Sequence, residues 1–296
     1  MTRSVSDSAN PALRLVPGLF VVIWSSGFIV ARLVAPHAEP FTFLSLRFLL
    51  TVVVLGTVAL VAGARWPVGR RGWRNALVAG ILLQGLYLDG VFWAVSHGLP
   101  AGLTALITSL QPLLAALVAG PLLGERVSRR RWLGIGIGAV GAGLVLVPKV
   151  GSGADAVPPA ALAACFAATL SLTVGTLWQK RFAAAIDLRT NAAVQFLGAA
   201  LVTLPLALLL EEGRFDATPP ALASLAWAVL GLSVGGVLLL LWLIRREAVA
   251  GVSALFYLVP AVSALMAYAL FGETLAPVQV GGMVVAVIGV ALASRD

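Results

Sequence analysis

The sequence is poor in charge and in cysteine, and both shortages limit what the chain can be. Only 11% of its 296 residues are charged, 60% are hydrophobic, and its mean hydropathy is +1.02. These values lie far outside the range of soluble globular proteins, so a soluble fold is excluded. The one cysteine, Cys165, lies in an apolar stretch, which excludes a disulfide within the chain. One cysteine and two histidines cannot build a usual zinc site, and we expect no metal and no cofactor.

Groups suited to catalysis inside a membrane are equally scarce. An intramembrane enzyme needs a nucleophile with a base, or a metal cluster, at depth. His37 falls in a predicted loop and His97 at a predicted helix end, and no serine motif of hydrolase type accompanies them. The sequence therefore does not predict an enzyme.

Long apolar stretches without charge are what the chain has in abundance. Five of them, such as Leu99 to Gly124, reach or exceed the roughly 20 residues that cross a bilayer as a helix. Together with less uniform stretches they predict ten membrane-spanning helices with short connections. The expected ranges are 13–34, 40–62, 73–97, 99–123, 130–148, 157–180, 189–210, 218–244, 249–271 and 275–294.

The second half of the chain, 149–296, repeats the first half, 1–148, at an offset of about 148 residues. Matching positions include Pro112 and Pro260, Gly124-Glu125 and Gly272-Glu273, Trp93 and Trp242, and Ala101-Gly102 and Ala250-Gly251. Each half contains five predicted spans. Because five is odd, the second half enters the membrane in the opposite sense to the first. The sequence thus predicts an all-α integral membrane protein of two inverted five-helix repeats, an architecture of alternating-access transporters.

Basic residues gather on one side of the predicted helices. With the N-terminus inside, 16 of the 20 Lys and Arg fall on the cytoplasmic side, and the opposite side is mostly acidic. The positive-inside rule then places both termini in the cytoplasm. These charges are dispersed over short loops and form no continuous basic face. Anionic lipid is therefore the expected partner, nucleic acid is not, and we expect a monomer or a weak homodimer.

Several motifs resemble one family of membrane transporters. They are Trp24-Ser25-Ser26-Gly27-Phe28, Pro40-Phe41-Thr42-Phe43, Leu46-Arg47-Phe48, Gly98-Leu99-Pro100-Ala101-Gly102 and Leu122-Leu123-Gly124-Glu125-Arg126. At this spacing in a ten-helix duplication, they resemble the EamA-type transporters of the drug/metabolite transporter superfamily. The resemblance implies export of amino acids or other small metabolites across a bacterial inner membrane. It also implies a central cavity formed by the first four helices of each repeat, with the fifth at the periphery.

Polar and aromatic residues inside the predicted spans indicate what could line such a cavity, because polar groups in a membrane usually face protein or water. Threonines and glutamines form helical stripes on several spans. Serine and threonine also bond to their own helix, so a purely structural role stays open for each. The candidate substrate-binding residues are Trp24, Phe28, Gln84, Tyr87, Asp89, Trp93, Thr104, Thr108, Gln111, Thr173, Gln195 and Tyr257.

Asp89 is the acid that lies well inside a predicted span. An ionised carboxylate there needs water, a cation or a basic partner. Two interpretations stay open: a structural ion pair with Arg32 or Arg47, or a proton acceptor or binding group for a substrate ammonium. Arg47, about two turns into the second span, could hold a carboxylate or serve the structure alone.

Trp24 lies near the middle of the first span, away from the interfaces where tryptophan is common. With the other aromatic candidates it would give a lining suited to apolar or aromatic side chains. The matched Pro112 and Pro260 permit bends that could act as hinges. Glu125 and Glu273 are expected to cap or tie helix ends.

Facilitated, gradient-driven export of neutral or aromatic amino acids by alternating access is the function that the sequence favours. The small multidrug transporters of the same superfamily depend on a glutamate in their first helix, whereas residues 15–31 contain no acid here. A proton-coupled drug or metabolite antiporter using Asp89 is the alternative, and a lipid-carrier flippase is the second. A channel fits less well, because no filter or ring of like charges is evident.

Overall fold

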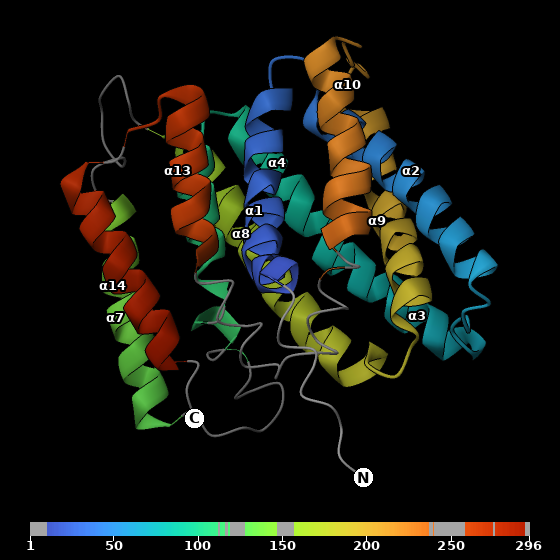
Figure 1. The fold of residues 1–296 in the computed structure, drawn as a ribbon, viewed down its shortest axis with the longest axis horizontal. Coiled ribbons are helices and arrows are strands. Elements are labelled where there is room, and N and C mark those ends of the chain that lie inside the picture. The colour runs from blue at the N-terminus through green and yellow to red at the C-terminus, as the bar shows by residue number, and fades with distance from the viewer. Residues whose placement is uncertain are drawn as a thin grey trace.

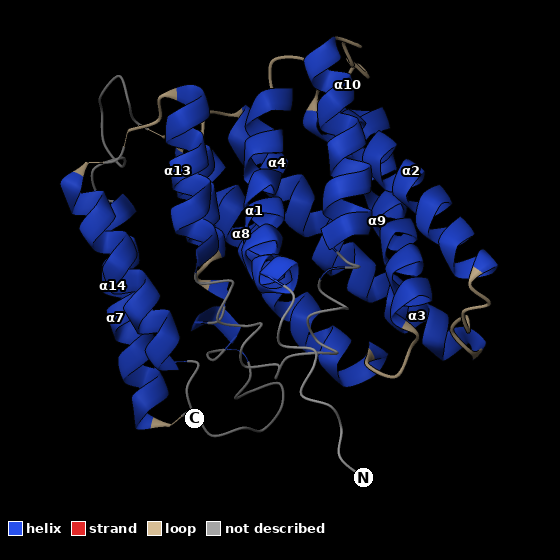
Figure 2. Ribbon diagram, in the orientation of Figure 1, coloured by secondary structure: helices blue, strands red, loops and turns tan. Residues whose placement is uncertain are grey.

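A computed structural model describes residues 11–111, 113–115, 118, 128–146, 157–236, 239, 258–274 and 276–293. These residues form a bundle of helices whose ends gather at an upper and a lower level (Figure 1). Figure 2 shows helices joined by loops across the described part, as the composition predicts. Four residues of interest, Pro112, Glu125, Trp242 and Tyr257, lie outside it.

The helices follow the predicted spans closely. In chain order they are α1 (Pro11–Val34), α2 (Pro40–Val61), α3 (Gly69–Gly80), α4 (Tyr87–Ser96), α5 (Ala101–Thr108), α7 (Arg129–Leu146), α8 (Pro159–Trp178), α9 (Leu188–Leu210), α10 (Pro219–Ala226), α13 (Val259–Phe271) and α14 (Pro277–Ala293). In the described part, π-helical segments continue some of them: η2 (Ile81–Leu86) joins α3 to α4, η4 (Gln179–Ala183) follows α8, and η5 (Trp227–Gly235) follows α10. Proline begins α2, α8 and α10, where its missing N–H needs no partner.

Helix length and hydropathy agree with a multi-pass membrane protein. Within the described ranges, five helices are long and apolar enough to span a bilayer: Val16–Val34, Pro40–Val61, Gly69–Ser96, Pro159–Ala183 and Leu188–Leu210. The shorter apolar helices there are Ala101–Ala115, Trp132–Gly141, Pro219–Gly235, Val259–Phe271 and Pro277–Gly289. Each of the ten predicted ranges overlaps one of these ten helices.

Contacts between loops fix the direction of the helices. A bridge between Ala38 and Phe215 joins the end of α1 to the start of α10 at the upper level of Figure 1. There the glycine between α4 and α5, Gly98, also faces Pro158 at the start of α8. At the lower level the Thr190 hydroxyl in α9 donates to the carbonyl of Arg65 between α2 and α3. Consequently α1 and its repeat counterpart α8 run in opposite directions, and so do α2 and α9.

Close packing through small residues holds two helix pairs together. Gly80 in α3 faces the backbone of Gln195 in α9, with no room between them for a side chain. Gly289 in α14 faces Gly138 and Gly134 in α7 in the same way. The contact between α7 and α14 is thus packing through small residues, and this pair stands at one edge of the bundle (Figure 1).

The π-helical segments of α3–α4 and α10 occupy matching places in the two halves. An offset of 149 residues carries η2 onto 230–235, which lies within η5. The wider turn leaves carbonyls without their usual helical partners, and hydroxyls bond some of them. Ser171 donates to the carbonyl of Leu82 at 2.9 Å, and Ser233 donates to that of Ala228 at 2.9 Å. Segments of this kind are frequent at functional sites, and η2 contains the candidate Gln84.

We expect Gly80→Ala to lower the stability of the protein. The new methyl group would meet the carbonyl oxygen of Gln195, so α3 and α9 must move apart, at a cost of about 1–3 kcal/mol. Gly56→Ala in α2 is the matched control, because no atom lies within 4 Å of its added methyl group. Thermal unfolding in detergent should show a lower apparent melting temperature for Gly80→Ala alone. Equal melting temperatures for both variants would contradict the close approach of the two helices.

Candidate functional site

The candidate threonines lie in the interior of the bundle and bond to their own helices. Thr104 donates to the carbonyl of Pro100 at 2.9 Å, Thr108 to that of Thr104 at 2.7 Å, and Thr173 to that of Thr169 at 2.8 Å. All three side chains are buried. Their hydroxyl hydrogens are therefore engaged, and what they offer to another group is an acceptor oxygen.

Thr108 is where three of the inner helices meet. Its hydroxyl lies near the side chains of Tyr87 of α4 and Cys165 of α8. Its own hydrogen goes to the carbonyl of Thr104, so what it offers to another group is an acceptor oxygen. Cys165 is fully buried. The structure thus brings together the candidates Tyr87 and Thr108 and adds Cys165, which is not among the predicted candidates.

The two candidate glutamines make cross-helix contacts. Gln111, just beyond α5, donates to the Thr176 hydroxyl of α8 at 3.3 Å. Gln195 of α9 donates to the side chain of Gln179 in η4 at 3.0 Å. The third, Gln84, is half-buried in η2. The first two therefore join helices, whatever else they bind.

The aromatic candidates differ in exposure. Phe28 is 4% exposed within the main hydrophobic core, whereas Trp24, one turn earlier in α1, is half-buried at the edge of that core. The Trp24 ring packs on Phe20 with their centroids 5.4 Å apart. Of these two, Trp24 is the one with surface left for a ligand. Trp178 donates from Nε1 to the carbonyl of Asn75, so it joins α8 to α3.

Asp89 is 4% exposed, and its partner in the described part is a hydroxyl rather than a cation. Thr203 Oγ1 of α9 lies 2.9 and 2.8 Å from the two carboxyl oxygens. Of the two interpretations left open for Asp89, the ion pair with Arg32 or Arg47 does not form in the structure. Arg32 instead approaches Glu273 at 3.9 Å, and Arg47 bonds to Ser233 of η5. The reason is geometric, because Asp89 faces α9 while Arg47 reaches across to η5.

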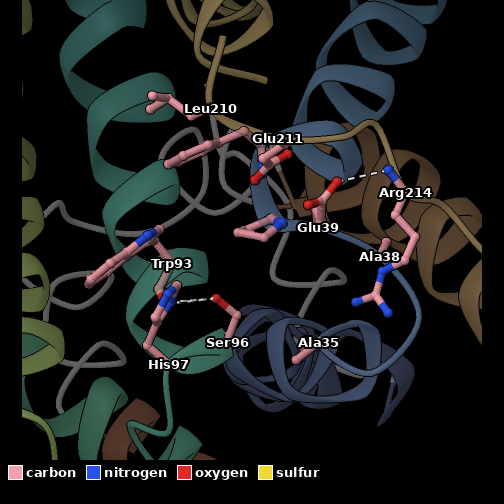
Figure 3. Close-up of a pocket in the computed structure, with 11 residues that line it drawn as sticks. Ala35, Ala38, Glu39, Trp93, Ser96, His97, Leu210, Glu211 and Arg214 are labelled. Atoms are coloured by element: carbon pink, nitrogen blue, oxygen red, sulfur yellow. Dashed lines mark hydrogen bonds between the residues drawn. The ribbon is translucent and has the colours of Figure 1, made fainter. Parts of the chain in front are cut away.

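A cavity of about 350 Å³ opens at the upper end of the bundle (Figure 3). Trp93, Ser96 and His97 form one wall, with the Trp93 and His97 rings stacked at a centroid distance of 3.9 Å. Glu39 and Glu211 stand opposite. Trp93 is the sequence-predicted candidate that lines this cavity, which places it nearer the end of the bundle than Tyr87 or Thr108.

Both glutamates at this cavity accept hydrogen bonds from backbone amides of a distant part of the chain. Glu211 accepts from the amides of Phe41 and Thr42, at 2.9 and 2.7 Å, and from the Thr42 hydroxyl at 2.8 Å, so it caps α2. Glu39 in turn accepts from the amide of Arg214 at 2.8 Å. Hydrophobic patterning cannot reveal such contacts, since the partners lie some 170 residues apart.

Glu273 plays the same part for another helix. Its carboxylate accepts from the amides of Ala101 and Gly102 at the start of α5, each at 3.4 Å, and it also approaches Arg32. The prediction that Glu273 caps or ties a helix end is thereby confirmed. Acidic groups suit these positions, because helix N-termini carry unpaired amides and partial positive charge.

The chain is similar to a known family of transporters over most of its length. The model of the EamA-like transporter family matches residues 18–147 and again residues 159–295. The chain is 26% identical to an uncharacterized inner membrane transporter, YedA, of Escherichia coli K12, over 92% of this chain and 88% of that protein. It is 27% identical to a probable amino-acid metabolite efflux pump of Salmonella typhimurium, over 92% and 91%.

Two further similarities cover nearly the whole chain. A probable terminal-alkyne amino-acid exporter of Streptantibioticus cattleyicolor is 28% identical over 94% of this chain and 91% of that protein. A solved crystal structure, 21% identical over 97% of both chains, superposes with a TM-score of 0.64 and therefore shares the fold.

Replacing Glu211 by glutamine should destabilise the upper end of α2. The amide group loses the charge that favours the helix N-terminus, and its NH₂ cannot accept from the amides of Phe41 and Thr42. We expect a loss of about 1–2 kcal/mol, seen as a lower apparent melting temperature. Glu212→Gln, an exposed neighbour, is the control and should change little. Similar behaviour of the two variants would show that the cap is unimportant.

Proposed function

The chain belongs to the EamA-like transporter family, and we propose that it exports neutral and aromatic amino acids and related small metabolites across a bacterial inner membrane. As a member of this family it is a multi-pass membrane transporter rather than an enzyme. The substrate class is supported by relatives named as amino-acid exporters, which the chain matches over more than nine tenths of its length.

The proposed mechanism is alternating access between two inverted five-helix repeats, 1–148 and 149–296. The family model matches once in each half, and counterpart helices such as α1 and α8 run in opposite directions. Two such halves can expose a shared cavity to one side of the membrane at a time. The pairing of α7 with α14 at the edge leaves the other helices to form that cavity.

The proposed cavity lies between α1, α4, α5 and α8, where Trp24, Tyr87, Thr108 and Thr173 are found. Aromatic surface binds apolar and aromatic side chains, and the few polar atoms among it orient the ligand. Trp93 and the cavity at the upper end would then border the exit, because the positive-inside rule places this end outside.

Facilitated transport down the substrate gradient is the proposed mode, since α1 has no acid in residues 15–31. Proton antiport through Asp89 is the second candidate. It is favoured by one observation, the burial of this carboxyl group beside a hydroxyl. A lipid-carrier flippase has no comparable observation in its favour.

The orientation can be tested with single cysteines in a Cys165→Ala background. Glu212 and Arg70 are both exposed. Glu212 follows the upper end of α9, and Arg70 lies in the first turn of α3, which begins at the lower level. If both termini are cytoplasmic, a membrane-impermeant thiol reagent applied to intact spheroplasts should label Glu212→Cys and spare Arg70→Cys until the membrane is opened. The reverse pattern would invert the proposed topology.

Substrate and coupling can be tested together by uptake of labelled amino acids into proteoliposomes, with and without an imposed proton gradient. We expect saturable uptake of neutral or aromatic amino acids that ignores the gradient and falls roughly tenfold or more in Trp24→Ala, because a large apolar contact is lost. Trp132→Ala, which removes a half-exposed tryptophan from α7, is the matched control.

Two results would change the proposal. Gradient-stimulated uptake that Asp89→Asn abolishes would replace facilitated transport with proton antiport. No uptake of any amino acid by well-folded protein would remove the substrate class and leave the family membership standing.

A further inference from the structure

Arg47 is a charged side chain buried inside the bundle. It lies seven residues from the start of α2, about 10 Å along the helix, and is 5% exposed. A guanidinium group keeps its charge at every physiological pH. A buried charge in a membrane protein is costly unless an opposite charge or hydrogen bonds compensate it.

The compensation that the structure provides for Arg47 is incomplete. Its Nε and Nη2 atoms both lie 3.3 Å from one oxygen, the Ser233 hydroxyl of η5, which gives two long hydrogen bonds. Ser233 uses its own hydrogen on the carbonyl of Ala228, so it serves Arg47 only as an acceptor. A guanidinium has five N–H donors, and a hydroxyl neutralises none of its charge.

The buried and half-buried acids of the described part are engaged elsewhere. Asp89 is bonded to Thr203, Glu211 caps α2, and Glu273 caps α5 beside Arg32. Within the described ranges, no carboxylate forms an ion pair with Arg47. The described part of the chain therefore holds a permanent cation in the interior of the bundle without supplying the anion.

The surroundings of Arg47 are those of the proposed cavity. Tyr87 of α4 lies close enough to interact with the guanidinium electrostatically, and Tyr87 in turn lies near Thr108 of α5. Ser233 comes from the second half of the chain, whereas Arg47, Tyr87 and Thr108 come from the first. The guanidinium thus lies between the two halves that alternating access would move apart.

We propose that Arg47 binds the carboxylate of the transported substrate. The planar guanidinium presents parallel N–H groups that match the two oxygens of a carboxylate. In the loaded transporter the carboxylate takes the place of the Ser233 hydroxyl and supplies the missing negative charge. This inference rests on the proposed function and narrows it, because it selects substrates with a free carboxylate over the corresponding amides and amines.

The test compares three molecules that share one side chain: phenylalanine, phenylalaninamide and phenethylamine. Uptake of each into proteoliposomes is measured for the wild type, for Arg47→Met and for Arg70→Met. Arg70 is an exposed arginine at the lower end, so its variant removes one positive charge outside the proposed site. The wild type and Arg70→Met should prefer the free acid by about 10- to 100-fold, the usual effect of a bond to a charged group.

Arg47→Met should lose this preference by slowing transport of the acid while sparing that of the amide. Equal loss of all three molecules would mean that Arg47 serves the structure alone and would overturn the inference. So would a wild type that transports acid, amide and amine equally well, although the transport proposal would then stand.

A binding measurement keeps the inference testable if none of the three molecules is transported, the outcome that would refute the proposed function. Thermal unfolding in detergent is followed with and without phenylalanine, and with phenylalaninamide as the control ligand. Stabilisation of the wild type by the acid alone, absent in a folded Arg47→Met, supports a carboxylate site. Absence of stabilisation in the wild type at saturating concentration contradicts it. Arg47→Lys keeps the positive charge but lacks the parallel N–H groups of the guanidinium. Compared with Arg47→Met, it should restore part of the thermal stabilisation by phenylalanine.

Discussion

Inside a bilayer no water is available for hydrogen bonding, and this constraint shapes every polar group of the chain. The backbone satisfies its hydrogen bonds by forming helices, in which amides and carbonyls bond within one segment. Buried threonines satisfy theirs by donating to the carbonyl four residues earlier, as Thr108 and Thr173 do. At helix ends, glutamates such as Glu211 accept from the free amides, here those of α2. Arg47 has only a hydroxyl acceptor in the described part, and its incomplete compensation is why we propose a ligand there.

The sequence predicted much of the fold because a bilayer makes hydropathy decisive. Apolar length located all ten helices, and most observed ends fall within a few residues of the expected ranges. These features depend on local composition or on period, and both can be read from a single chain.

The parts that sequence could not predict depend on partners far away in the chain. The partner of Asp89 is Thr203, 114 residues later, and patterning gave no reason to prefer it over a basic residue. The π-helical segments η2 and η5 also escaped prediction, because their turns contain the same apolar residues as ordinary helix. The twelve candidate binding residues stay predictions, although the structure shows that Tyr87 and Thr108 meet.

The caps on α2 and α5 have a consequence for biosynthesis. These helices belong to the first half of the chain, whereas Glu211 and Glu273, which cap them, belong to the second. A ribosome delivers α2 to the membrane long before it has made either glutamate. The first helices are therefore inserted with uncapped ends at the aqueous interface. The caps form only after the segments that carry Glu211 and Glu273 have been inserted. The ends of α2 and α5 in the first half are thus stabilised by residues of the second half.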